Sequence, residues 1–150
     1  MCKFCNIIAG KIKRDILYQD PWVVVFLGKP HHLGHTQVVL REHKEDLTTL
    51  SEIELHAFID HMVMVARVLK KVLKPDKINY ELFGNWVPHL HWHILPRFKS
   101  DPDFGNPPGQ PLRNQPYTKR NLSEKQIKAI KDELEIERKI RRIPLFKAEI

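Results

Sequence analysis

Three histidines alternate with apolar residues in segment 89–96 (HLHWHILP). Successive side chains of a β-strand point to opposite faces, so a strand here places His89, His91 and His93 on one face, about 7 Å apart from one to the next. The apolar residues between them then point into a core. Imidazole is a fair nucleophile toward phosphorus at neutral pH, and a second imidazole can bind a phosphate oxygen or deliver a proton. The row predicts a nucleophilic histidine, a metal site or an anion-binding surface.

Two cysteines, Cys2 and Cys5, form a CxxC pair near the N-terminus. Two thiolates at this spacing can hold a zinc ion, which usually takes four ligands. Because the chain has no other cysteine, two of its nine histidines would complete such a site. His43 and His89 are candidates, since each stands at the end of a predicted strand. The alternative is a pair of ordinary reduced cysteines, and no βαβ unit surrounds them to favour redox chemistry.

A further histidine cluster, residues 31–35 (HHLGH), lies between two predicted strands. It could be a metal-binding or phosphate-binding loop, or a polar loop in which one histidine is functional. Gly34 permits a tight backbone, which would bring His35 back toward the sheet.

Hydrophobic periodicity predicts the elements that position these residues. Strands are expected at residues 16–18, 22–27, 36–40, 78–83 and 88–98, where β-branched and aromatic residues gather. A long helix is expected over residues 51–74, because Ser51 and Glu54 fit a capping box and Pro75 ends the apolar helical repeat. Five strands with one long helix predict an α+β domain with a mainly antiparallel sheet.

The remaining segments are less regular. Residues 2–10 indicate a short helix or turn, and residues 101–116 are rich in Pro, Gly and Asn, as is typical of a surface loop. A second helix is expected over residues 122–142, capped by Asn121 or Ser123 and packed on the body or on a second subunit. Its alternating charges favour a solvated face over a nucleic-acid-binding face. No internal repeat or long linker is visible, so one domain over residues 1–150 is predicted.

The charge and composition of the chain limit the kinds of partner that it is expected to bind. The chain has 150 residues with 25 Lys+Arg against 18 Asp+Glu, giving a net charge of +7. Such a surface favours phosphate-bearing partners, or serves solubility alone. No apolar run is long enough to span a bilayer and no signal peptide is visible, so a cytoplasmic protein without a membrane partner is expected. A nucleic-acid partner is not favoured, because stacking-aromatic and helix-turn-helix patterns are lacking.

At residues 89–95 the sequence resembles the signature of the histidine triad (HIT) family, His-φ-His-φ-His-φ-φ, where φ is apolar. Residues 2–10, the stretch 30–40 with its Gly-His-Thr, and the step 41–43 are also similar to the family, so the resemblance covers about residues 1–100. Pro88 and the pair Pro96-Arg97 bring the chain nearer to the dinucleoside polyphosphate hydrolase branch and bacterial HIT proteins than to the phosphoramidase branch. Residues 101–150 would be a loop and a helical extension of a HIT-like domain.

The resemblance implies a HIT-like fold and cleavage of a nucleotide conjugate, such as a dinucleoside polyphosphate, at the α-phosphate. His91 would attack phosphorus and form a nucleotidyl-histidine intermediate, which water then hydrolyses. The backbone carbonyl of His89 would orient the ring of His91, while His93 would contact the phosphate and assist the leaving group. His35 would lie behind these histidines and help to position them. Relatives of this kind are homodimers, so a homodimer is expected.

The resemblance also implies a pocket for adenine or another purine nucleotide. Its residues would be Phe4, Ile7, Phe26, Gly28, His35, Asn85 and Trp86. Gly28 stands where the family usually has Asp or Asn on the ribose hydroxyls, and Trp86 stands where Ser or Thr often touches the phosphate. Asn85 could replace the usual Gln beside it.

Some HIT proteins carry a structural zinc ion. Their ligands correspond here to Cys2, Cys5, His43 and His89, so the resemblance implies a structural zinc that fixes the catalytic strand, and no catalytic cofactor. Two other hypotheses follow from the residues. One is a non-catalytic nucleotide-binding or interaction protein, suggested by Gly28 and Trp86. The other is a zinc-containing nucleic-acid-binding module, suggested by the charge and the CxxC pair.

Overall fold

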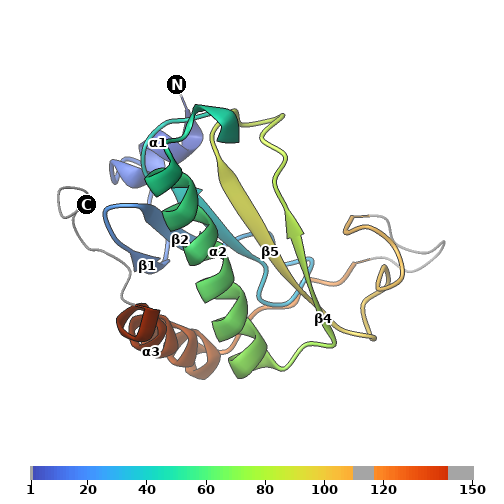
Figure 1. Ribbon diagram of the computed structural model, residues 1–150. Coiled ribbons are helices and arrows are strands. Elements are labelled where there is room, and N and C mark those ends of the chain that lie inside the picture. The colour runs from blue at the N-terminus through green and yellow to red at the C-terminus, as the bar shows by residue number, and fades with distance from the viewer. Residues whose placement is uncertain (1, 110–116, 142–150) are drawn as a thin grey trace.

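A computed structural model describes residues 2–109 and 117–141 of the chain, and its elements form an α+β fold (Figure 1). In chain order these are α1 (Lys3–Ile8), β1 (Ile16–Gln19), β2 (Val23–Leu27), β3 (Thr36–Leu40), a short 3₁₀ helix (Leu47–Thr49), α2 (Glu52–Leu73), β4 (Lys77–Glu81), β5 (His91–Arg97) and α3 (Glu124–Arg141). The five strands form one sheet in the order β1-β2-β3-β5-β4, and every neighbouring pair is antiparallel. The predicted fold class and mainly antiparallel sheet are confirmed.

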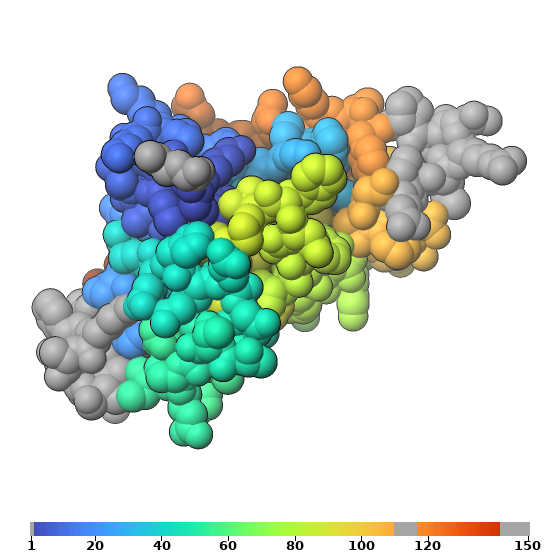
Figure 2. All heavy atoms as spheres, turned by 90° about the horizontal axis from the view of Figure 1, so that it is seen from above, coloured from blue at the N-terminus to red at the C-terminus, as the bar shows by residue number. Residues whose placement is uncertain are grey.

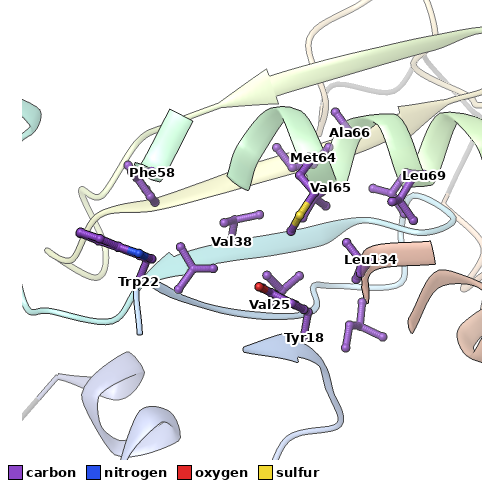
Figure 3. Close-up of a cluster of buried hydrophobic side chains, with 14 of the residues drawn as sticks. Tyr18, Trp22, Val25, Val38, Phe58, Met64, Val65, Ala66, Leu69 and Leu134 are labelled. Atoms are coloured by element: carbon purple, nitrogen blue, oxygen red, sulfur yellow. The ribbon is translucent and has the colours of Figure 1, made fainter. Parts of the chain in front are cut away.

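Both faces of the sheet are covered, which explains the continuous apolar run in β2. Val23 and Val25 join the larger core with residues of α2 and α3, as Figure 3 shows for Val25. Val24 and Phe26 join a smaller core with Phe4 of α1. The period of two therefore sends alternate residues of one strand into two separate cores.

Local signals fix the ends of α2 as the sequence predicts. The Ser51 hydroxyl accepts a hydrogen bond from the Glu54 backbone N–H (3.3 Å), and the Glu54 carboxylate accepts one from the Ser51 N–H (2.9 Å). Two of the unpaired N–H groups at the helix start are satisfied in this way. The helix ends at Leu73, and the capping residue Lys74 has a φ of 50°, in the left-handed region, directly before Pro75.

The turn between β1 and β2 is attached to α2 through a buried carboxylate. Asp20 accepts hydrogen bonds from the backbone N–H of Trp22 (2.8 Å) and Val23 (3.0 Å) and from the Tyr18 hydroxyl (2.8 Å). His61 of α2 lies 2.6 Å from the same carboxylate. Burial alone would raise the pKa of Asp20, but the bonds from His61 and the backbone hold it below its ordinary value. The carboxylate therefore stays charged and ties the sheet edge to the helix.

Helix α3 packs on the body of the chain, against α2 and β1. Ile130 and Leu134 are buried in the larger core, and Lys71 of α2 pairs with Glu133 at 2.6 Å. Ser123 caps the helix, because its hydroxyl accepts from the Gln126 N–H at 3.2 Å. Among the described residues, no helix is long and apolar enough to cross a membrane.

Several expected boundaries shift. Strand β5 begins at His91 rather than at residue 88, because the His89 N–H donates to the Val87 carbonyl at 2.8 Å instead of to a partner strand. The three histidines are therefore not a row on one strand, since His89 lies before it. Strand β4 ends at Glu81, which leaves Phe83 outside it. Residues 101–109 form turns, as expected of a loop, while 110–116 and 142 fall outside the described residues.

Candidate functional site

The His91 ring is held by the backbone two residues earlier. Its Nδ1 lies 2.6 Å from the His89 carbonyl oxygen, so Nδ1 carries the proton and donates. The other ring nitrogen, Nε2, is then left with a free lone pair. Burial lowers the pKa of His91 below its ordinary value, although the bond to His89 works in the opposite direction. The geometry thus presents a neutral, oriented imidazole.

A second pair of rings lies beside His91. The His93 ring is 4.8 Å from the His91 ring, and its Nδ1 is 2.9 Å from Nε2 of His35. The other nitrogen of His35 lies 3.3 Å from the Lys29 carbonyl, to which it donates. His93 must then donate from Nδ1 to His35, which leaves its own Nε2 without a proton. Burial lowers the pKa of His93 to about 4, and the neighbouring His91 ring and Lys29 ammonium act in the same direction.

The place of His35 depends on the absence of a side chain at Gly28. A Cβ atom at Gly28 would lie 2.5 Å from the His35 ring, well inside van der Waals contact. The Asp or Asn usual in the family therefore cannot stand here with His35 in this position.

We expect the substitution Gly28→Ala to displace the His35 ring and break its bond to His93. Overpacking of this kind lowers the free energy of unfolding by about 1–3 kcal/mol. Thermal melting measures the loss, and ¹⁵N NMR of the His93 ring reports the lost partner. Gly105→Ala is the matched control, because a Cβ atom at Gly105 would meet no other atom within 4 Å. An unchanged His93 ring spectrum in Gly28→Ala would contradict the predicted contact.

The histidines face a cleft of about 780 Å³. It is lined by all seven residues predicted for the nucleotide pocket: Phe4, Ile7, Phe26, Gly28, His35, Asn85 and Trp86. In Figure 2 the N-terminal segment (blue) and the yellow-green turn near residue 85 lie next to each other. The Phe4 ring is 4.6 Å from His91 and 6.1 Å from Phe26, so an apolar wall adjoins the oriented imidazole. Such a wall suits a flat aromatic group.

The cleft also holds charged residues that the sequence did not single out. Lys3, Arg14 and Lys29 line it, while Glu81 is its one carboxylate among the described residues. Burial raises the pKa of Glu81 above its ordinary value. The excess of cations favours an anionic ligand. These four residues come from four separate segments of the chain, so no local pattern could have identified them as one group.

Two aromatic side chains at the rim are unusually exposed. Trp86 is 99% exposed and Phe83 is 67% exposed, and both line the cleft. The Phe83 ring lies 6.4 Å from His93. Trp86, predicted as a nucleotide contact, therefore stands at the mouth of the cleft and not against the imidazoles.

The four predicted metal ligands meet beside this cleft. One ligand atom from each of Cys2, Cys5, His43 and His89 lies within 4.8 Å of the others. Sγ of Cys2 is 3.4 Å from Nδ1 of His89, Sγ of Cys5 is 3.3 Å from Nδ1 of His43, and the two Nδ1 atoms are 3.2 Å apart. Tetrahedral zinc with these donors separates its ligand atoms by about 3.3–3.8 Å. The donor set and spacing fit a zinc ion.

The hydrogen bonds behind the two histidines agree with that fit. Nε2 of His89 donates to the Leu40 carbonyl at 2.6 Å, and Nε2 of His43 lies 3.3 Å from the Glu45 carboxylate. These bonds keep the protons on Nε2, so both Nδ1 lone pairs point at the cysteines.

A second group, His32 with Asp101 and Asp103, does not fit a metal ion. Arg97 already pairs with Asp103 at 2.9 Å, and Arg120 pairs with Asp101. The guanidinium groups supply the positive charge that a cation would bring. No sequence pattern indicates this network, because its members come from three separate segments.

Comparison with known proteins agrees with this geometry. The HIT domain family matches residues 9–100, more than half of the chain. The chain belongs to the HIT family. An uncharacterised HIT-like protein of Methanocaldococcus jannaschii is 37% identical over 106 residues, covering 67% of this chain and 82% of the relative.

Two further relatives carry names that state an activity. An adenosine 5′-monophosphoramidase of Schizosaccharomyces pombe is 29% identical over 141 residues, covering 89% of this chain and 95% of the relative. An AP-4-A phosphorylase of Mycobacterium tuberculosis is 36% identical over 84 residues, covering 50% of this chain and 42% of the relative.

Solved HIT structures have the same fold. A hypothetical histidine triad nucleotide-binding protein of Sulfolobus tokodaii matches with a TM-score of 0.68 and 25% identity, covering 91% of this chain and 94% of that one. A zinc-bound histidine triad protein of Mycobacterium smegmatis matches with a TM-score of 0.68 and 22% identity, covering 90% and 94%.

Proposed function

We propose that this HIT protein binds a purine nucleotide conjugate and cleaves it at the α-phosphate, with dinucleoside polyphosphates as the substrate class. The observation that carries the proposal is the 2.6 Å bond from Nδ1 of His91 to the His89 carbonyl, which leaves Nε2 as a neutral nucleophile on a cationic cleft. The named relatives support the reaction class, since one is a phosphoramidase and one acts on AP-4-A.

The reaction takes two displacements. Nε2 of His91 forms a bond to the α-phosphorus, and the bond from phosphorus to the leaving-group oxygen breaks with its electron pair on that oxygen. Attack places a positive charge on the ring, which the bond from Nδ1 to the His89 carbonyl stabilises. Water then attacks the same phosphorus and passes a proton to Nε2 of His93. The bond from phosphorus to Nε2 of His91 breaks with its electron pair on that nitrogen, which releases a nucleoside monophosphate and restores His91.

His93 assists the leaving group once substrate is bound. In the free cleft it is neutral, with a pKa of about 4. A polyphosphate beside the ring raises this pKa, because an opposite charge favours the imidazolium. Its Nε2 then carries a proton for the departing oxygen, while Nδ1 remains bonded to His35.

We also propose that Cys2, Cys5, His43 and His89 hold a structural zinc ion. The spacing of their donor atoms supports it, as does the zinc-bound HIT neighbour. A closed set of four protein ligands leaves no position for substrate, so zinc would fix His89, and through its carbonyl the His91 ring. No catalytic cofactor is then required.

The function is tested with a panel of diadenosine tetraphosphate and adenosine 5′-phosphoramidate. We expect adenosine monophosphate as the product of both, and a transient adduct of one nucleoside monophosphate on the intact protein. Rapid quenching with intact mass spectrometry measures the adduct, and peptide mapping places it on His91. Turnover without any adduct would contradict the covalent route.

A non-catalytic nucleotide-binding role is the second candidate. The exposed Trp86 favours it. This side chain stands where Ser or Thr often touches the phosphate in the family, and it lies in solvent instead. Tight binding of adenosine monophosphate with no turnover of either substrate would establish this role.

The chain is further proposed to be one domain that assembles as a cytoplasmic homodimer. Edge strand β4 carries Tyr80, which is 49% exposed, and leads to the exposed Phe83. An apolar edge of this kind suits pairing with a second copy. Sedimentation equilibrium would show a monomer if the homodimer proposal is wrong.

A further inference from the structure

Two aromatic rings from distant parts of the chain are stacked beside the cleft. The ring of His31 lies 5.3 Å from that of Tyr117, at an interplanar angle of 10°. His31 is exposed and lines the cleft. Tyr117, which belongs to the C-terminal extension, stacks on the His31 ring. One face of the His31 ring is thus supported, and the other remains available to a ligand.

Hydrogen bonds and a ring contact hold the stacked pair of His31 and Tyr117 in place. The Tyr117 hydroxyl donates to the buried Asp103 carboxylate and accepts from the Gly109 N–H at 3.0 Å. His32 meets the Tyr117 ring edge-on at 5.4 Å, and its Nε2 lies 2.9 Å from the same carboxylate. Arg97 of β5 fixes that carboxylate at 2.9 Å. Such bonds pre-organise a flat surface before any ligand arrives.

The loop after β2 leads from the catalytic histidines to this surface. Lys29 is close enough to His93 to lower its pKa, and His31 follows two residues later on the same loop. Phe4 and Phe26 supply a separate apolar wall beside His91. A cleft of about 780 Å³ lies toward the upper end of the range for ligand pockets, about 300–1,000 Å³. An aromatic wall beside His91, a cation and a second aromatic surface therefore line one cleft.

We propose that His31, supported by Tyr117, is the binding subsite for the nucleobase of the leaving group, with Lys29 on the phosphates between. The subsite rests on the proposed function and makes its substrate class specific: two nucleosides joined by a phosphate chain. Stacking of a base on an aromatic side chain tolerates any base, so the subsite selects for a second base without fixing which one.

The test compares two substrates that differ by the second nucleoside, diadenosine tetraphosphate and adenosine 5′-tetraphosphate. We expect wild type to prefer the first. His31→Ala and Tyr117→Leu should lower kcat/KM for diadenosine tetraphosphate by roughly tenfold, in line with the loss of one stacked base. Both variants should change the rate on adenosine 5′-tetraphosphate less than twofold. His31→Phe keeps a stacking ring and should retain the preference, as should His56→Ala, an exposed histidine on α2.

Other results would overturn the subsite. Equal losses on both substrates would assign the ring pair a structural role only, and unchanged kinetics in His31→Ala would remove the base contact. If wild type hydrolyses neither substrate, the proposed function fails, and calorimetric binding then decides the subsite separately. Tighter binding of diadenosine tetraphosphate, lost in His31→Ala, would support it, while equal affinity for the two compounds would overturn it.

Discussion

Replacing His91 with alanine should lower turnover of dinucleoside polyphosphates by about 10⁴-fold or more. The loss is large because removing a covalent nucleophile abolishes both displacements at once. Binding of adenosine monophosphate should change little, since the apolar wall of Phe4 and Phe26 remains. Steady-state kinetics with product identification measures the first effect, and isothermal calorimetry measures the second.

The matched control for this variant is His56→Ala, which removes an exposed histidine of α2 outside the cleft. It should retain full turnover. The His91→Ala protein should also melt within a few degrees of wild type, which would exclude misfolding as the cause. Full hydrolysis of diadenosine tetraphosphate by His91→Ala would refute the nucleophile assignment.

Removing one cysteine of the quartet should release one zinc ion per chain and lower the melting temperature. A ligand that binds only the folded state stabilises it by about 4 kcal/mol at a concentration 1,000-fold above its Kd. For a chain of this size, such a loss lowers the melting temperature by roughly 10 °C. Cys2→Ser and Cys5→Ser should both show it, as measured by elemental analysis and differential scanning calorimetry.

Two further measurements make this result specific. A strong chelator should bring wild type to the melting temperature of Cys2→Ser and should leave that variant unchanged. His31→Ala, which removes a histidine outside the quartet, should keep its zinc. Stoichiometric zinc in a Cys2→Ser/Cys5→Ser double variant would eliminate the proposed site.

The secondary structure followed from short-range signals wherever these are strong. The strand over residues 36–40 was predicted to the residue, and α2 to within one residue at each end, because a capping box and a proline act locally. Strand β5 was predicted too long. Its start depends on the turn before His89, where backbone bonds to nearby residues replace the sheet ladder.

The sequence by itself determined the fold class and the candidate residues for chemistry. The spacing of His91 and His93, the CxxC pair and the apolar periodicity are local properties, and they identified the histidines, a possible metal site and the fold class. Tertiary structure alone decided which groups surround them. Lys29, Glu81 and Tyr117 reach the site through chain crossings that no local pattern records. Structure also decided that His35 packs against Gly28, where the absence of a Cβ atom leaves room for its ring.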